Sequence, residues 1–269
     1  MPASALGLAL GSAVLHAAWN LLLARSRDVQ AAAASTFLLA VALVAPFAAV
    51  WWSAEPSVWP YALASTLLEA VYVLVLVQAY RVTDLSIVYP LTRGLSPVLV
   101  LGAGVVLLGH GASATEVAGV LLVAGGVVLV RGRQGHADGR TLVVVATIAA
   151  AIAAYTLVDR AGIQHAGALT YFVLVLAGPC LVYPPLVGLR AMRQEFGLGT
   201  FAAALANLGS FLLGLLALRR GAAAPVLAVR SSSIVIATLL ARRFLREEVS
   251  LGRLAGSLVV FAGVVLLAL

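Results

Sequence analysis

The chain has 269 residues, of which 63% are hydrophobic and only 10% are charged, and its formal net charge is +7. A soluble protein carries about a quarter charged residues, so this composition excludes a water-soluble domain and requires lipid as the solvent. All the basic residues are arginines, placed singly or in pairs between apolar runs. That spacing is typical of a membrane topology signal and excludes a nucleic-acid-binding surface. Cys180 is the single cysteine, so no internal disulfide forms.

Apolar runs follow one another along the chain, each close to the roughly 20 residues that span a bilayer. Only helices or closed barrels satisfy backbone polar groups in lipid, and these runs lack the polar–apolar alternation of barrel strands. We therefore predict an all-α integral membrane protein with ten transmembrane helices and short connections. The predicted spans are 3–23, 31–52, 58–80, 84–108, 113–130, 141–158, 167–189, 198–218, 222–241 and 249–269.

The second half of the chain repeats the first. Residues 84–130 align without a gap on residues 221–267, so that Arg93 falls on Arg230. Further matched pairs are Ser96 with Ser233, Trp19 with Tyr155 and Asn20 with Thr156. We expect two five-helix repeats, at 1–134 and 135–269, and an odd number of spans in each would insert the second repeat upside down relative to the first.

The arginines other than Arg93 and Arg230 are unevenly distributed. Twelve lie in the connections after odd-numbered spans or in the flanks of these connections, and three, Arg160, Arg219 and Arg220, lie in the connections after even-numbered spans. Positively charged connections stay in the cytoplasm. The odd-numbered connections, including residues 242–248, are therefore predicted to be cytoplasmic, and both termini are predicted to be external.

In the first predicted span, His16, Trp19 and Asn20 are polar or amphipathic residues in an apolar run. His16 and Asn20 are four residues apart and share a helix face. They either line a cavity or only hold helices together by hydrogen bonds, and Trp19 also suits a position at the membrane interface.

In the third span, Glu69 is the only carboxylate that we expect deep inside a span, and Tyr72 shares its face one turn on. A charge at the bilayer centre costs about 2.5–3.5 kcal/mol on insertion scales, so it faces a cavity or a partner. Glu69 is therefore a candidate for substrate binding and proton coupling, with a structural pair to an arginine as the alternative. His16 is the rival proton carrier because its usual pKa lies near neutral pH.

Arg93 stands between Pro90 and Pro97, and Pro225 precedes Arg230. Interrupted helices at matching positions of two halves point to a transporter's binding site. Arginine offers five fixed donors that suit a carboxylate or a phosphate, so we favour substrate binding over a structural role for both arginines. Four further cavity candidates are Tyr89, Tyr155, Asn207 and Ser233.

Enzyme signatures are missing from the sequence, which has neither a zinc-protease nor a nucleophile-elbow motif and no lysine for a phosphate-binding loop. We therefore expect no catalysis, no cofactor and no metal site.

The span count, the inverted repeat, the His-x-x-Trp-Asn stretch and the Arg93/Arg230 pair together resemble the drug/metabolite transporter superfamily, and within it an EamA-type permease. This resemblance covers essentially the whole chain. It implies a secondary carrier that works by alternating access at a central cavity between the repeats and exports amino acids or related metabolites. It also implies cytosolic termini, whereas the arginine distribution predicts external ones, and we follow the arginines.

The leading hypothesis is thus an exporter of small anionic or zwitterionic metabolites, a multi-pass protein of a bacterial inner membrane, monomeric or weakly dimeric. In it, Arg93 and Arg230 hold the anionic end of the substrate, and Glu69 holds an ammonium group or carries the coupling proton. The alternatives are a multidrug or cation efflux carrier that needs Glu69 alone, and a flippase for anionic lipid headgroups that opens laterally beside the fourth and ninth spans.

Overall fold

The computed structural model describes residues 1–82, 85–109, 111–131, 138–237 and 251–269. The predicted cytoplasmic segment 242–248 lies outside these described residues.

The described chain is helical, and its long helices lie close to the predicted spans. The helices are α1 (Ala3–Leu23), α2 (Val29–Val50), the 3-10 turn η1 (Pro56–Val58), α3 (Trp59–Val82), α4 (Leu85–Val106), α5 (Ala114–Arg131), α6 (Gly139–Gly162), α7 (Ala168–Val187), α8 (Leu189–Glu195), α9 (Leu198–Arg220), α10 (Ala223–Ser231) and α12 (Leu251–Ala268). The prediction at 141–158 was too short, because α6 runs one turn further, to Gly162.

Six segments are long and apolar enough to cross a membrane: Ala3–Leu23, Val29–Val50, Pro56–Ala79, Gly139–Gly162, Ala168–Val187 and Leu198–Arg220. Shorter apolar helices cover Pro90–Val106, Ala114–Leu129, Ala223–Ala237 and Ala255–Ala268. The six long segments indicate a multi-pass membrane protein. The count of ten spans stays a prediction.

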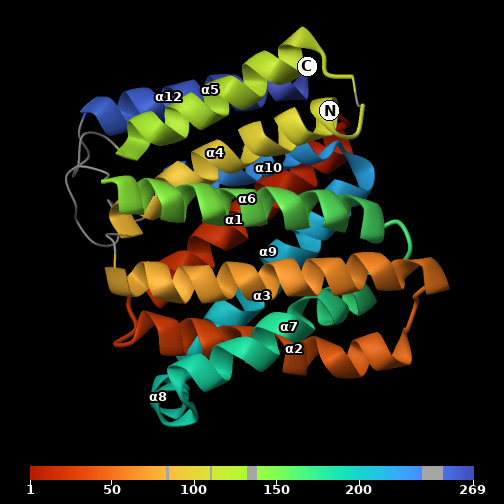
Figure 1. Cartoon of the computed structure of the whole chain (residues 1–269), viewed down its shortest axis with the longest axis vertical. Helices are drawn as coiled ribbons and strands as arrows, with labels where there is room; N and C mark the ends of the chain where they lie inside the picture. The colour runs from red at the N-terminus through yellow and green to blue at the C-terminus, as the bar shows by residue number, and fades with distance from the viewer. Residues whose placement is uncertain (83–84, 110, 132–137, 238–250) are drawn as a thin grey trace.

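The helices lie side by side, from α5 and α12 at one edge to α2, α7 and α8 at the other (Figure 1). The two termini lie at the same end of this bundle, where the Met1 amino group donates to the Leu267 carbonyl at 2.9 Å. The α1–α2 connection and α8 lie at the opposite end (Figure 1). That end carries Arg25, Arg27, Arg190 and Arg193, so we call it the arginine-rich end.

Glycines bring α5 and α12 into close contact. A Cβ atom added at Gly126 would lie 2.7 Å from the Val260 nitrogen and 2.8 Å from the Gly256 carbonyl oxygen. One added at Gly263 would lie 2.9 Å from the Gly119 carbonyl oxygen. Small residues let membrane helices approach until their backbones touch, so this edge of the bundle depends on glycine.

We expect Gly126→Ala to destabilise the protein by about 1–3 kcal/mol, since the new methyl group overpacks against backbone atoms that cannot move aside. Gly125→Ala is the matched control, because a Cβ atom there meets nothing within 4 Å. Both substitutions gain the same helix propensity, so the difference between their thermal unfolding midpoints in detergent isolates the packing cost. Equal midpoints would contradict the contact.

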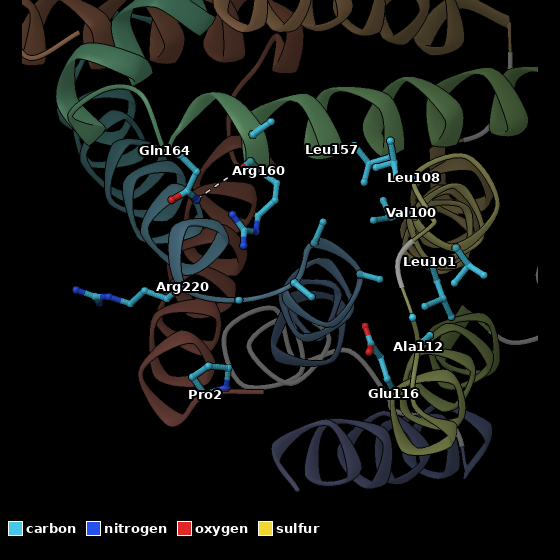
Figure 2. A pocket seen from close by; sticks show the side chains of 18 residues that line it. Pro2, Val100, Leu101, Leu108, Ala112, Glu116, Leu157, Arg160, Gln164 and Arg220 are labelled. Atoms are coloured by element: carbon cyan, nitrogen blue, oxygen red, sulfur yellow. Dashed lines mark hydrogen bonds between the residues drawn. The ribbon is translucent and has the colours of Figure 1, made fainter. Parts of the chain in front are cut away.

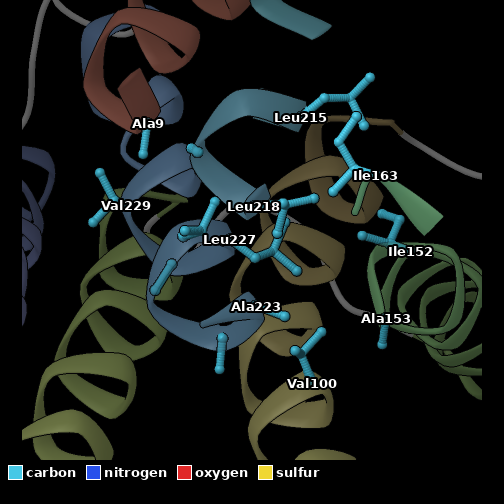
Figure 3. Close-up of a cluster of buried hydrophobic side chains, with 14 of the residues drawn as sticks. Ala9, Val100, Ile152, Ala153, Ile163, Leu215, Leu218, Ala223, Leu227 and Val229 are labelled. Carbon is cyan, nitrogen blue, oxygen red and sulfur yellow. The ribbon is translucent and has the colours of Figure 1, made fainter. Parts of the chain in front are cut away.

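An apolar cluster fills the bundle around α10 on the side of the termini. It joins Leu227 of α10 to Val100 of α4 and Leu218 of α9, all nearly inaccessible to solvent (Figure 3). We call these residues the apolar barrier, because they separate the middle of the bundle from its end.

The prolines do not interrupt the helices where the sequence predicted. Helix α4 continues through Pro90 and Pro97. Pro225 lies in the first turn of α10, where a missing N–H costs nothing, and the break comes after Arg230 instead, at Ser232. There the Ser232 hydroxyl donates to the Val229 carbonyl at 2.7 Å, and the Ser232 N–H donates to the same carbonyl at 3.1 Å.

At the end with the termini, the α2–α3 and α6–α7 connections bind each other. The Glu55 N–H donates to the His165 carbonyl at 2.9 Å, and the Gly167 N–H to the Ser53 carbonyl at 2.7 Å. The Ser53 N–H donates to the Thr170 hydroxyl at 3.1 Å. Hydrogen bonds from His165 and then from Ser57 lower the pKa of Glu55. We call these bonds the loop clasp.

Candidate functional site

Eight of the residues predicted from sequence to bind substrate line one small cavity of about 60 Å³ in the middle of the bundle. They come from α1, α3, α4, α6, α9 and α10, and they are His16, Trp19, Glu69, Tyr72, Arg93, Tyr155, Asn207 and Arg230. Arg93 and Arg230 therefore share one cavity. We call this space the central cavity.

Arg93 contacts α1 through His16. One guanidinium nitrogen of Arg93 lies 2.8 Å from His16 Nε2, and the Trp19 indole N–H lies 3.2 Å from His16 Nδ1. Both neighbours are donors, but a neutral imidazole has only one acceptor nitrogen and an imidazolium has none. The shorter distance favours Arg93 as the donor to Nε2. Protonating His16 would break this contact and place two cations together.

Arg230 contacts α1 through Ser12. Its Nε–H donates to the Ser12 hydroxyl at 2.9 Å, and that hydroxyl donates to the Ser210 carbonyl of α9 at 2.7 Å. Gly214 provides the space, because a Cβ atom there would lie 2.8 Å from the guanidinium carbon of Arg230. The sequence analysis did not predict that Ser210 and Gly214 lie beneath Arg230.

Gly214→Ala therefore tests whether the placement of Arg230 matters. The added methyl group meets the flexible end of a side chain, so we expect folding to change little while Arg230 moves off Ser12. Losing a hydrogen bond to a charged group costs about 1.5–3 kcal/mol, or roughly ten- to a hundredfold. We expect transport to fall in that range, with Gly7→Ala, which meets nothing within 4 Å, as control. Unchanged transport would argue against a role for the position of Arg230.

Glu69 is 5% exposed and faces the central cavity. The expectation that it pairs with Arg93 or Arg230 is not met, since no salt bridge joins them within 4 Å in the part of the chain that the structure describes. Asn207 also faces this cavity, and its side-chain oxygen is buried with no hydrogen-bond partner among the described residues. The cavity thus presents acceptors as well as arginine donors.

Glu69 is not the only buried carboxylate, which corrects the sequence analysis. Asp159, in the extra turn of α6, is 2% exposed and accepts hydrogen bonds from Ser65 at 2.6 Å and Tyr171 at 3.0 Å. Tyr171 is fully buried. A Cβ atom at Gly162 would clash with its hydroxyl group. These bonds satisfy Asp159 and join α3, α6 and α7.

A second cavity of about 290 Å³ adjoins the central cavity. The two share Trp19, Tyr72 and Arg93 among their lining residues. The second cavity also includes Asn20 and reaches Ala24, which is exposed at the arginine-rich end. The apolar barrier lies on the other side of the central cavity, so this conformation is accessible from the arginine-rich end.

Three predicted site residues remain, namely Asn20, Ser233 and Tyr89. The Asn20 side chain donates to the His16 carbonyl of its own helix at 2.7 Å rather than to another helix. Ser233 is buried, has no hydrogen-bond partner for its hydroxyl, and does not line the central cavity. The side chain of Tyr89 lies outside what the structure describes.

The fold is shared with known structures. A solved structure described only as "Crystal structure of protein" superposes with a TM-score of 0.80 at 17% identity, covering 99% of this chain and 96% of that one. At this identity the likeness shows the fold alone. The sequence matches no family model, and no curated protein matches it.

Proposed function

We propose that this protein is a secondary-active transporter, working as an exporter, of small anionic or zwitterionic metabolites such as amino acids. The observation that carries this proposal is the central cavity, which gathers two arginines, Glu69 and the unsatisfied oxygen of Asn207 in the middle of an apolar bundle. Charged groups inside a membrane protein mark substrate and ion pathways by default.

The helix contacts support ten spans arranged as two inverted repeats. The main contacts occur in matching pairs when the halves are exchanged: α1 with α9 matches α6 with α3, and α2 with α9 matches α7 with α3. Exchanging the halves converts the contact of α5 with α12 into itself, and likewise the contact of α2 with α7. This pairing, and the resemblance of the sequence to EamA-type permeases, favour a drug/metabolite transporter that alternates access between the repeats.

The charges favour a zwitterion. Arg93 and Arg230 offer donors to a carboxylate or phosphate, while Glu69 and Asn207 offer acceptors to an ammonium group. The available volume limits the cargo to small molecules, since the central cavity is about 60 Å³ and its neighbour about 290 Å³.

The direct test is transport by the purified protein in liposomes. A thermal-shift screen against amino acids, organic acids, phosphates and cationic dyes selects the ligand, and uptake of that radiolabelled ligand is then measured with and without a pH gradient. We expect a zwitterion or an anion to stabilise the protein and to be transported. Stabilisation by cationic dyes alone would contradict the proposal.

A cation efflux carrier is the second candidate, and one observation favours it. Arg93 and Arg230 already bind His16 and Ser12, whereas Glu69 faces the cavity and forms no salt bridge with an arginine of the described segments. If the protein is a cation efflux carrier, it should transport cationic dyes, and lysine substitutions at both Arg93 and Arg230 should leave dye transport intact.

We also propose that the arginine-rich end faces the cytoplasm and the termini face outward. A cysteine added after Leu269 in a Cys180→Ser background is expected to react with a membrane-impermeant maleimide in intact cells. A cysteine at Arg27 is expected to react only after the cells are opened. The reverse pattern would invert the orientation and convert the access described above into an outward-facing one.

A further inference from the structure

A separate and larger cavity lies at the end of the bundle that carries the termini. Its volume is about 630 Å³, and α4, α5, α6 and the α9–α10 connection line it (Figure 2). None of the predicted substrate-binding residues lines it. We call it the outer pocket, and Val100 and Ala223 of its floor belong to the apolar cluster that closes off the central cavity.

Two opposite charges point into the outer pocket from different helices. Figure 2 shows the Glu116 carboxylate, from α5, and the Arg160 guanidinium, from α6, both directed into the space, while the Arg220 side chain points away. Both Glu116 and Arg160 are partly buried. Among the described residues, no salt bridge within 4 Å joins them or pairs either with another side chain.

The Glu116 side chain does not form the local hydrogen bond that its sequence context predicts. The order Ser113-Ala114-Thr115-Glu116 is a capping box, in which the serine binds the glutamate N–H and the glutamate side chain binds the serine N–H. Here the Ser113 hydroxyl accepts from the Glu116 N–H at 3.1 Å, but no return bond forms among the described residues. The carboxylate is instead presented to the pocket.

The rest of the pocket wall is apolar or small. Val100 and Leu101 of α4, Leu108 just after the end of α4 and Leu157 of α6 form the apolar side, next to the two charges (Figure 2). Beyond them, Leu107 at the end of α4 is 78% exposed, so this side continues toward the outer surface of the bundle. A ligand that fills the space therefore needs a cation, an anion and an apolar group.

We propose that the outer pocket binds an amphipathic zwitterion, whose ammonium group pairs with Glu116 and whose anionic group pairs with Arg160 while its apolar part covers the leucine side. The site is distinct from the central cavity and does not depend on the transport proposal. Two sources supply this chemistry: a free amino acid with an apolar side chain, and the headgroup of phosphatidylethanolamine with the start of its acyl chains.

Binding to the full-length purified protein in detergent tests the proposal with two probes. L-leucine binding is measured by equilibrium dialysis, and dioctanoyl phosphatidylethanolamine binding by native mass spectrometry. We expect at least one probe to bind about tenfold more weakly to Glu116→Gln and to Arg160→Gln. Arg220→Gln, whose side chain points away from the pocket, is the matched charge control and should bind normally.

Comparing ligands shows which chemical groups of the ligand the outer pocket binds. 4-Methylpentanoate lacks the ammonium group of leucine, and dioctanoyl phosphatidylglycerol lacks that of phosphatidylethanolamine, so each should bind as weakly to the wild type as its zwitterion does to Glu116→Gln. Arg93→Lys should not change binding at the outer pocket, which separates this result from any failure of the central site. Unchanged affinity of both probes in Glu116→Gln and Arg160→Gln, or an equal loss in Arg220→Gln, overturns the proposal.

Discussion

We expect transport to fall about ten- to a hundredfold when Arg93 or Arg230 is replaced by lysine. Lysine keeps the charge but loses the planar fork that binds two oxygens at once. The loss corresponds to one charge-assisted hydrogen bond, about 1.5–3 kcal/mol. The measurement is the initial rate of substrate uptake into liposomes, divided by the amount of correctly inserted protein.

Arg220→Lys is the control, since Arg220 is exposed at the end of the bundle and does not reach the central cavity. Its transport should match that of the wild type. Thermal unfolding of all three variants separates a lost ligand contact from a lost structural one, because Arg93 and Arg230 also hold α1 through His16 and Ser12. Full transport by both Arg93→Lys and Arg230→Lys would rule out an anion-clamping role for the pair.

The second large effect is expected at Glu69. Glu69→Gln fixes the side chain in a form that resembles the protonated acid, so the variant should still exchange substrate but lose uphill transport driven by a pH gradient. Uphill accumulation should fall at least about tenfold, while counterflow of labelled against unlabelled substrate should persist. The two assays on one preparation separate coupling from binding.

The matched control is Glu195→Gln, a partly buried acid at the arginine-rich end whose carboxylate accepts from the Asp28 N–H at 3.0 Å. It should couple normally. If the Glu69→Gln variant still transports substrate uphill, Glu69 is not the coupling site. Another residue then carries the proton, or another ion drives transport. His16 is a poor substitute, because its neighbours Arg93 and Trp19 are both donors and an imidazolium could accept from neither.

Sequence patterns were sufficient to predict where the long helices lie along the chain and to match Arg93 with Arg230 as equivalent positions, which line one cavity. Both follow from local information, namely the length of the apolar runs and the alignment of one half on the other. The immediate partners of the arginines could not be predicted. Whether Arg230 meets Ser12 or Glu69 depends on the rotation of α1, α3 and α10 about their axes, which the apolar residues around them do not specify.

Asp159 was missed for a related reason. It falls just after the last apolar residues of its predicted span, where a carboxylate usually ends a membrane helix. In the structure Ser65 and Tyr171 supply donors at that depth, so α6 continues through the charge. The signal for this arrangement lies in two other helices, so no pattern within 141–158 could reveal it.

The loop clasp has a kinetic consequence for any cycle in which the two halves separate at the end with the termini. Its two backbone bonds and the Ser53–Thr170 bond each stabilise the closed arrangement by about 0.5–1.5 kcal/mol. Breaking all three before new bonds form raises the barrier to separation by about 1.5–4.5 kcal/mol, which slows opening roughly ten- to a thousandfold. In such a cycle, the dwell time of the closed state depends on a few hydrogen bonds between two connections, far from the central cavity.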